Sequence, residues 1–160
     1  MTLQWPTEVL EMTHDSANLP THNANCLFCK IVNHQIPCHS VYEDADIIAF
    51  LDIGPIVRGH TLVVPKYHTT NYLDCPPAVA AKLASVTSQI CRGVMAATGA
   101  EACHLLVNNG AAAMQSVMHL HQHILPRFIG DGFTLPWPAK KLADADVATL
   151  VGAIRGQLAR

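Results

Sequence analysis

The segment Gln115–Ile129, QSVMHLHQHILPRFI, decides how the rest of the sequence is interpreted. Its three histidines, His119, His121 and His123, are separated from one another by single apolar or amide side chains. Successive side chains of a β-strand point to opposite faces, so a strand would place the three imidazoles on one face, roughly 6–7 Å apart. A helix would spread them over about 200°. Branched aliphatic neighbours favour a strand, and we expect Pro126 to end it.

Three interpretations of this strand are open from the residues alone. It can be a solvated strand with one polar face. It can supply zinc ligands, because the pattern His-x-His on a strand can bind one ion. It can also carry phosphoryl chemistry, because a neutral imidazole can attack phosphorus near pH 7 while a neighbouring imidazole protonates the leaving group. The rest of the chain has to decide between them.

Length and composition predict one globular domain with modest tails. The chain has 160 residues, of which half are apolar and 14% are charged. Its net charge of −2 gives no reason to expect a nucleic-acid surface, and no apolar run reaches a membrane-spanning length. The acidic N-terminus lacks the apolar core of a signal peptide. We therefore expect a protein of the cytoplasm, or also the nucleus, whose six cysteines are thiols or metal ligands.

Periodicity, caps and turn residues predict an α+β fold with a five-stranded antiparallel sheet. A short helix capped by Asn25 stops before Pro37, and a long amphipathic helix begins at Pro76 and Pro77 and ends at Gly99. The predicted strands are Ser40–Tyr42, Ile47–Leu51, His60–Pro65, His104–Val107 and the histidine segment. A homodimer that extends the sheet would cover its exposed edge.

A last helix is predicted over Asp144–Leu158, capped by Asp144 or Asp146 and apolar on one face. The sequence therefore divides into three parts. These are a flexible N-terminal extension at residues 1–22, the main domain at residues 23–130 and a C-terminal tail with a helix at residues 131–160.

Two cysteines, Cys26 and Cys29, are spaced so that they face the same side of one helical turn. Such a pair can be half of a zinc site, a redox pair or a coincidence. Since no second pair of this spacing occurs, the other zinc ligands would have to be histidines. His68, shortly after the third strand, has no obvious role in a core.

The run His119-Leu-His121-Gln-His123-Ile-Leu125 resembles the signature of the histidine triad (HIT) family. Further segments that resemble the family follow in its usual order, namely Cys26–Lys30, Ile36–Pro37, Tyr42–Asp44, Ala49–Ile53, Gly59–Lys66 and Gln115–Val117. The resemblance covers about residues 25–130 and indicates the Hint-like nucleoside phosphoramidase branch, in particular microbial members with the cysteine pair and a Gly-Asp-Gly-Phe segment. It implies the HIT fold in a homodimer whose sheets join through the long helices and neighbouring strands.

The resemblance implies a nucleotide hydrolase that attacks the α-phosphate, most specifically a purine nucleoside phosphoramidase that releases AMP or GMP. His121 matches the family nucleophile, which forms a transient nucleotidyl-imidazole. His123 matches the residue that holds the phosphate and handles the leaving-group proton. His60 would lie close to the triad, and Ser116 matches a catalytic position on the phosphate side.

The same resemblance implies a nucleotide pocket. Asp52 matches a ribose-binding carboxylate, whose two acceptors suit a vicinal diol. Phe50 and Ile53 would form walls for the base, while Asn108 and Gln115 match polar positions beside the phosphates. The implied nucleotide-binding residues are Phe50, Asp52, Ile53, Asn108, Gln115, Ser116, His121 and His123.

Relatives that carry the cysteine pair hold zinc at four positions. In this sequence those positions are Cys26, Cys29, His68 and His119. Two thiolates and two imidazoles form a closed tetrahedral set, so the implied cofactor is a structural Zn²⁺ that supports the fold without activating water. No organic cofactor is expected.

One position departs from the family pattern. Met114 stands where family members commonly have glycine before Gln-Ser. Because methionine rarely adopts a positive φ, we expect this loop to differ locally.

Two other functions are weighed against the phosphoramidase. The first is a dinucleoside polyphosphate hydrolase, since a pocket for ribose and α-phosphate tolerates many leaving groups. The second is a zinc-braced nucleotide-binding protein without enzymatic activity. Neither a nucleic acid nor a membrane is expected as a partner.

Overall fold

The computed structural model describes residues 22–134 and 139–159, so the expected flexible extension lies, apart from His22, outside the described residues. The strands are β1 (Ser40–Glu43), β2 (Ile47–Leu51), β3 (Thr61–Pro65), β4 (Ala102–Leu106) and β5 (Gln122–Arg127). The helices are α1 (Leu27–Val32), α2 (Pro77–Thr98), the short 3-10 helix η1 (Ala111–Ala113) and α3 (Asp144–Leu158). Chain contacts divide the protein into one unit that ends at Gly130 and a second that begins at Asp131.

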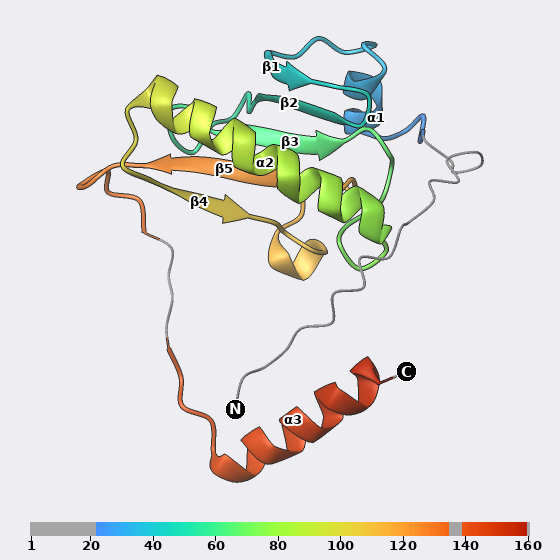
Figure 1. Cartoon of the computed structure of the whole chain (residues 1–160), viewed down its shortest axis with the longest axis vertical. Coiled ribbons are helices and arrows are strands. Elements are labelled where there is room, and N and C mark those ends of the chain that lie inside the picture. Colours follow the sequence, from blue (N-terminus) through green and yellow to red (C-terminus); the bar gives the residue numbers. More distant parts are fainter. Residues whose placement is uncertain (1–21, 135–138, 160) are drawn as a thin grey trace, which may run out of the picture. The chain divides into compact units, whose positions relative to one another are not determined.

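The five strands form one antiparallel sheet in the order β1-β2-β3-β5-β4. Hairpins connect β1 to β2 and β2 to β3, while α2 leads the chain across the sheet to β4 at its edge (Figure 1). The predicted α+β class and five-stranded antiparallel sheet are therefore confirmed. The structure contains one copy of the chain, so the expected dimer stays a prediction.

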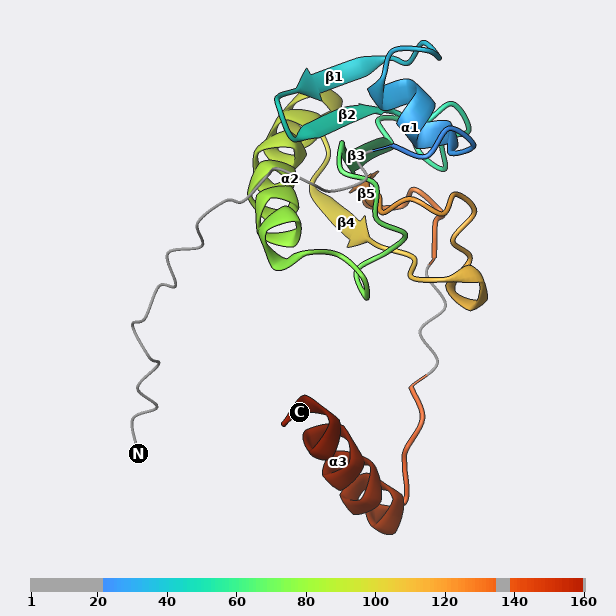
Figure 2. The same ribbon diagram turned by 90° about the vertical axis from the view of Figure 1, so that its right-hand side faces the viewer.

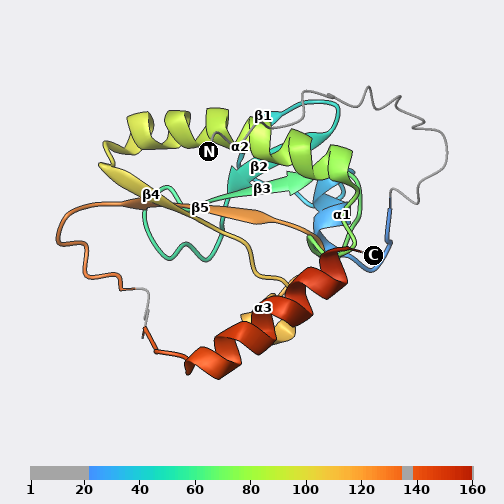
Figure 3. The same ribbon diagram turned by 60° about the horizontal axis from the view of Figure 1, so that its bottom comes forward.

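Side-chain alternation along the strands produces two separate cores, one on each face of the sheet. Ile47, Ala49 and Val63 pack with the buried side of α2, whereas their strand neighbours pack with α1. The members of the α1 cluster are Cys26, Phe28, Cys29, Ile31, Ile48, Phe50, Leu62 and Val64. The two helices thus cover opposite faces of the sheet (Figure 2), and α2 runs along the whole of its face (Figure 3).

The helix α2 is formed as the sequence predicts. Pro77 is its first residue, where a missing N–H leaves no intrahelical partner unsatisfied, and Gly99 caps its end in the left-handed conformation with φ 72°. Leu83, Val86 and Ile90 are buried along one face against the sheet.

The predicted histidine strand is wrong at its start, because β5 begins only at Gln122. The N–H of His119 is donated to the carbonyl of Val117 in a tight turn, at 2.8 Å. The N–H of Leu120 is donated to Thr69 in a loop, at 2.7 Å, so neither group can join a ladder. Of the three histidines only His123 lies in the strand, and the other two precede it in irregular backbone.

The prediction that Pro126 ends this strand is also wrong, since β5 continues to Arg127 and Pro126 pairs with Cys103 of β4. Pairing between β3 and β5 stops at Thr61 and Ile124, so β5 has a single neighbour beyond that point. A proline without an N–H is tolerated where no second neighbour needs a donor.

Helix caps differ from the predicted ones. The N-cap of α1 is Cys26 rather than Asn25, and its thiol accepts the N–H of Cys29 at 3.5 Å. The boundaries of α3 match the prediction, but its N-cap is Ala143 and no side chain caps it. Asp144 and Asp146 lie instead in its first turn, where negative charge favours the helix dipole.

Met114 adopts the left-handed conformation that its family position requires, with φ 64° and ψ 25°. The expectation that this loop differs from that of other family members stays a prediction. The Met114 side chain is 81% exposed, so this conformation strains the backbone but does not force the side chain against other residues.

Across the described residues, none of the helices is both long and apolar enough to span a bilayer.

Gly59 allows β3 and α2 to approach each other, and its substitution tests this packing. It has φ 86°, and an added Cβ would lie 2.5 Å from Thr98 Cγ2. We expect Gly59→Ala to lower the free energy of unfolding by about 2–4 kcal/mol in urea titrations, from left-handed strain and overpacking. Adding Thr98→Ser, which removes only that methyl group, should restore part of the loss.

The matched control is Gly93→Ala in the middle of α2, where an added Cβ meets no atom within 4 Å. It should raise the free energy of unfolding by about 0.5–1 kcal/mol, because alanine favours the helix. Equal effects of the two alanines would contradict the close approach at Gly59.

Candidate active site

His121 is held as a neutral imidazole with one defined tautomer. Its Nδ1 donates to the carbonyl oxygen of His119 at 2.7 Å, and because a carbonyl only accepts, Nδ1 carries the proton. Nε2 is thereby left with a free lone pair. The side chain is buried, and this burial lowers the pKa of His121, partly opposed by the hydrogen bond and by Asp52. The arrangement is that of a nitrogen nucleophile.

A chain of hydrogen bonds sets the tautomers of the neighbouring imidazoles. The N–H of Ile56 is donated to His60 Nδ1 at 3.3 Å, so His60 carries its proton on Nε2. This Nε2 lies 2.9 Å from His123 Nδ1 and donates to it. The proton of His123 is therefore on Nε2, which is buried and has no partner among the described residues. This N–H is available to a ligand next to His121, whose ring centroid is 4.9 Å away.

Burial keeps these two imidazoles neutral. It lowers the pKa of His123 to about 4, with further lowering from His121 and His60. It also lowers the pKa of His60, although the carboxylate of Asp52 opposes that shift from 3.5 Å. Asp52, His60 and His123 could in principle hold a metal. The two ring nitrogens face each other at 2.9 Å, shorter than the edge of about 3.3 Å that two nitrogens of a tetrahedral zinc site would have, so we interpret the group as a hydrogen-bonded chain.

Phe28 contacts both His121 and His119, and sequence reasoning missed this role. Its ring meets that of His121 edge-on with centroids 5.0 Å apart, and that of His119 at 6.0 Å. Its ring centroid is also 5.7 Å from that of Phe50, and both rings belong to the α1 cluster. The only signal in the sequence was its place between the two cysteines of one helical turn.

The loop before β5 uses its polar side chains to hold itself together. Both N–H groups of the buried Gln115 amide are donated to carbonyls, of Thr70 at 2.6 Å and Val117 at 3.0 Å, while its oxygen accepts from Gly110 at 2.7 Å. Asn108 donates to the carbonyl of Met114 at 3.4 Å, and Ser116 is exposed. The Gln115 side chain therefore stabilises the loop in this structure, and its contact with a nucleotide stays a prediction.

Two further predicted residues lie in the loop after β2. Asp52 accepts the N–H of Gly54 at 2.8 Å through one oxygen, and its other oxygen faces His60. The side chain of Ile53 is 94% exposed. An apolar side chain so exposed is available to a flat ligand.

Four sulfur and nitrogen atoms from distant parts of the chain converge beside this site. Cys26, Cys29, His68 and His119 each offer one donor atom, all within 4.8 Å of one another. His119 Nδ1 lies 3.4 Å from Cys26 Sγ, 3.6 Å from Cys29 Sγ and 3.3 Å from His68 Nδ1. His68 Nδ1 is 3.3 Å from Cys29 Sγ. A tetrahedral zinc site has edges of about 3.3–3.8 Å between such donors, so the set fits the ion.

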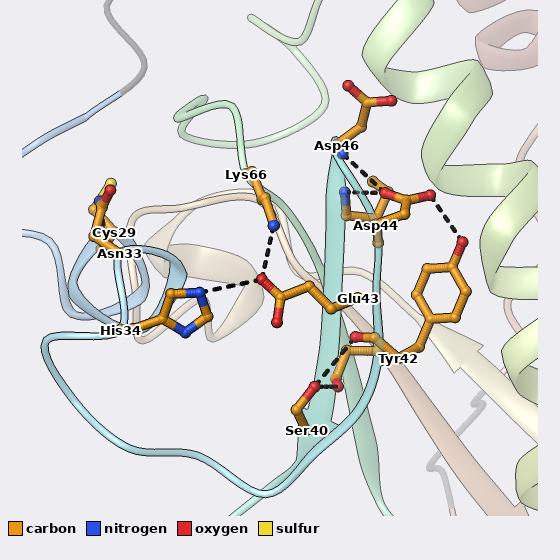
Figure 4. A network of polar contacts seen from close by, with 11 residues as sticks. Cys29, Asn33, His34, Ser40, Tyr42, Glu43, Asp44, Asp46 and Lys66 are labelled. Carbon is orange, nitrogen blue, oxygen red and sulfur yellow. Dashed lines mark hydrogen bonds and ion pairs between the residues drawn. The ribbon is translucent and has the colours of Figure 1, made fainter.

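Contacts outside this cluster orient its members. His119 Nε2 donates to the carbonyl of Pro65 at 2.8 Å, which leaves Nδ1 free as a ligand. Burial lowers the pKa of His119 to about 4, so it stays neutral. Glu43 accepts from Lys66 at 2.7 Å and faces His34 at 3.3 Å (Figure 4). The Lys66 hydrogen bond lowers the pKa of Glu43 and ties the segment that leads to His68 to β1.

The sequence profile of the HIT domain matches residues 33–130. The chain belongs to the HIT domain family. This confirms the family indicated by the three histidines, and the matched region contains the whole sheet. The cysteine pair lies just before the matched residues, so its assignment depends on the four-atom geometry described above.

Relatives and solved structures agree with this membership. An adenylylsulfatase of Arabidopsis thaliana is 37% identical, covering 84% of this chain and 70% of the relative. An adenosine 5'-monophosphoramidase of Schizosaccharomyces pombe is 34% identical, covering 79% and 92%. A crystal structure from Streptococcus mutans aligns with a TM-score of 0.84 at 37% identity, covering 87% of this chain and 88% of that one. A Zn-bound histidine triad family protein from Mycobacterium smegmatis aligns with a TM-score of 0.67 at 38% identity, covering 81% and 97%.

The buried neutral state of His123 predicts a pH-dependent stability. In the unfolded chain it takes up a proton near its ordinary pKa of 6.5, but in the folded chain only near 4. Between these values the unfolded state binds more protons, so stability is lost as the pH falls from 6.5 to 4. In urea titrations, His123→Gln should lower this loss by up to about 1.4 kcal/mol per pH unit, the slope of one proton.

The control is His39→Gln, which replaces an exposed histidine just before β1. Its slope should equal that of the unaltered protein. A slope for His123→Gln that equals the control would contradict the buried neutral assignment.

Proposed function

We propose that this HIT protein is a nucleotide hydrolase that acts at the α-phosphate through a nucleotidyl-histidine intermediate, and that its substrates are purine nucleoside phosphoramidates. The observation that carries the proposal is the pairing of two ring nitrogens with opposite roles. His121 offers a lone pair on Nε2, and His123 offers a buried N–H on Nε2 with no partner among the described residues. One can attack phosphorus while the other donates to the group that leaves.

In the first step His121 Nε2 attacks the α-phosphorus. Binding of the anionic substrate would favour uptake of one proton by the hydrogen-bonded His60–His123 pair, which makes the pair an acid. A new N–P bond then forms and the bond to the leaving amine breaks, while the amine takes the proton of His123 Nε2 and the pair becomes neutral. In the second step His123 accepts a proton from water, the oxygen of that water bonds to phosphorus and the N–P bond to His121 breaks. The products are a nucleoside monophosphate and the amine, and both imidazoles return to their starting states.

His60 supports the proton transfer by holding His123. Its Nε2–H fixes the His123 tautomer, and Asp52 is placed to stabilise positive charge that develops along the chain. Negative charge on the phosphate oxygens would be stabilised by the Ser116 hydroxyl and the Asn108 amide. Gln115, whose two N–H groups are donated to backbone carbonyls, would hold this loop in place and would have to exchange one of those bonds to contact the phosphate. We assign catalysis to His121, His123, Ser116 and His60.

The nucleoside would occupy the apolar side of the site. Asp52 can accept hydrogen bonds from both ribose hydroxyls, and Phe50 and Ile53 would contact the base. The proposed walls are apolar and offer the base no hydrogen-bonding side chain, which suits the broad flat surface of a purine. We therefore propose that AMP or GMP is released. The similarity to the adenosine 5'-monophosphoramidase of Schizosaccharomyces pombe supports the phosphoramidate class.

The alternative of a dinucleoside polyphosphate hydrolase shares every residue of this site and differs in the leaving group. The second alternative, a non-enzymatic zinc-braced nucleotide-binding protein, would need none of the fixed tautomers. Those tautomers therefore favour an enzyme.

Hydrolysis assays separate these functions. We expect adenosine phosphoramidate to be hydrolysed with a higher kcat/KM than a diadenosine polyphosphate, and His121→Ala to lower kcat by roughly 10⁴-fold while AMP still binds. Rapid quenching at alkaline pH, where an N–P bond survives, should recover an AMP adduct on His121 by mass spectrometry.

The control for this experiment is His39→Ala, which removes an exposed imidazole outside the proposed catalytic and nucleotide-binding residues and should retain full activity. A higher kcat/KM for the diadenosine substrate would contradict the phosphoramidase assignment. Undiminished hydrolysis by His121→Ala would overturn the nucleophile itself.

We also propose that Cys26, Cys29, His68 and His119 hold a structural Zn²⁺. The edge lengths between the four donors and the Zn-bound relative from Mycobacterium smegmatis support this assignment. All four positions of a tetrahedron would be filled by protein, so the ion would fasten α1 to the sheet. It would supply no step of the hydrolysis.

Metal analysis tests the zinc site. One zinc per chain is expected in the purified protein, and Cys29→Ser should lose it to a chromogenic chelator at a concentration at least tenfold lower. The same variant should unfold at a lower temperature. Cys38→Ser, which alters a half-buried thiol outside the cluster, should keep both properties, and an unchanged zinc content in Cys29→Ser would contradict the assignment.

A homodimer is proposed as the functional form. The edge strand β4 has no partner on its outer side within the described chain, and Leu105 on it is 46% exposed. A second copy joined through β4 and α2 would pair with that edge and cover apolar surface.

The division into an extension at 1–22, a HIT domain at 23–130 and a tail at 131–160 remains a proposal. The cytoplasmic location and the lack of nucleic-acid or membrane partners are proposals as well.

A further inference from the structure

The loop that joins β3 to α2 is folded around one carboxylate. Asp74 accepts the N–H of Asn71 at 3.0 Å and the N–H of Thr70 at 3.2 Å. It also accepts the hydroxyl of Thr69 at 3.1 Å. The hydrogen bond from Asn71 lowers the pKa of Asp74, so the carboxylate is charged near pH 7 and these bonds are charge-assisted. Asp74 therefore fixes the backbone of residues 69–74, although neither the proposed chemistry nor the proposed zinc site uses it.

This loop in turn holds the backbone that enters the proposed nucleophile. The Thr69 carbonyl accepts the N–H of Leu120 at 2.7 Å, and both residues are buried. Leu120 directly precedes His121, so this bond locates the backbone from which the reactive imidazole projects. A buried N–H that loses its acceptor is costly, so the segment would have to move if the Thr69 carbonyl turned away.

The same loop also holds the polar segment proposed to lie beside the phosphate. The Thr70 carbonyl accepts from Gln115 Nε2 at 2.6 Å, and the N–H of Tyr72 is donated to Asn109 Oδ1 at 2.9 Å. Gln115 and Asn109 are each the chain neighbour of a side chain proposed to stabilise the phosphate. The loop thus contacts the nucleophile segment and the phosphate segment at once, and one carboxylate orders it.

We propose that Asp74 is a positioning residue for the hydrolysis, which aligns His121 with the phosphate-binding side chains by ordering the loop at residues 69–74. This inference rests on the proposed function of the site. Asp74 acts through main-chain groups and not on the substrate. The nucleoside contact assigned to Asp52 comes from the loop after β2, which takes no part in these hydrogen bonds. Loss of Asp74 should therefore impair the chemical step more than nucleotide binding.

Kinetics of two variants test this separation. Asp74→Ala removes all three hydrogen bonds, and we expect kcat for adenosine phosphoramidate to fall by roughly 10- to 100-fold, the effect of a displacement of about 1 Å in a reacting group. The Kd of AMP, measured by calorimetry, should change by less than about threefold because the nucleoside contacts remain. Asp74→Asn keeps one acceptor oxygen, so it should show a smaller fall in kcat and serves as the second variant if the alanine variant folds poorly.

The matched control is Asp44→Ala in the turn between β1 and β2. Asp44 orders that turn in the same manner, since it accepts the N–H groups of Asp46 at 2.8 Å and Ile47 at 2.7 Å. It also pairs with Lys82 at 3.0 Å, so its loss should lower the unfolding temperature as well. The turn carries none of the proposed site residues, so kcat should stay within about twofold of the unaltered protein. A carboxylate that only stabilises the fold would give this same result at Asp74.

Amide hydrogen exchange followed by NMR tests the positioning without a substrate. In Asp74→Asn we expect the N–H of Leu120 to exchange at least roughly tenfold faster relative to the N–H groups of β3, a ratio that Asp44→Ala should leave unchanged. An unchanged ratio in Asp74→Asn, or a kcat of Asp74→Ala equal to that of the control, would overturn the inference. Absence of hydrolysis by the unaltered protein would contradict the proposed function instead, and the exchange ratio would still decide whether Asp74 fixes the backbone before His121.

Discussion

Side-chain alternation across the central strands is the constraint from which the site follows. Leu62 pairs with His123, and both side chains face α1, while Val63 and Gln122 face α2. Gln122 accordingly accepts a hydrogen bond from Thr87 of α2 at 3.0 Å. Polar chemistry is thus collected on one face, and the long helix packs on the other. A shift of one residue in the register of β5 would exchange the two sets.

The α1 face combines two sites that share one residue. His119 offers its ring to the four-atom cluster, and its main-chain carbonyl accepts a hydrogen bond from His121 Nδ1. Phe28, between the two cysteines, contacts both rings. The position of the His121 ring is therefore set by the same elements that bring the metal-ligand candidates together. Burial lowers the pKa values of His119, His121 and His123 alike, so all three rings are neutral near pH 7.

Sequence reasoning predicted most of the fold because its signals are local. Periodicity, Pro77 and Gly99 located α2, and the boundaries of α3 were predicted without error. The start of β5 could not be predicted, because the N–H of Leu120 is taken by Thr69, which is distant in the sequence. The tolerance of Pro126 likewise depends on which strand lacks a neighbour, a property of the sheet and not of the segment.

The site shows the same division between local and distant information. Residue types and order indicated the histidines and the two cysteines, but Phe28, Ile56 and Pro65 act through a ring edge, a backbone N–H and a carbonyl that no motif encodes. Met114 shows the reverse case, where the fold imposes a conformation that the residue itself disfavours.

The main-chain carbonyl of His119 has a consequence for how this family can diverge. No substitution can delete a backbone oxygen, so mutations at position 119 can abolish metal retention while the acceptor for His121 survives. The proposed zinc site and the proposed nucleophile therefore share residue 119 but use different atoms of it, a side-chain nitrogen and a main-chain oxygen.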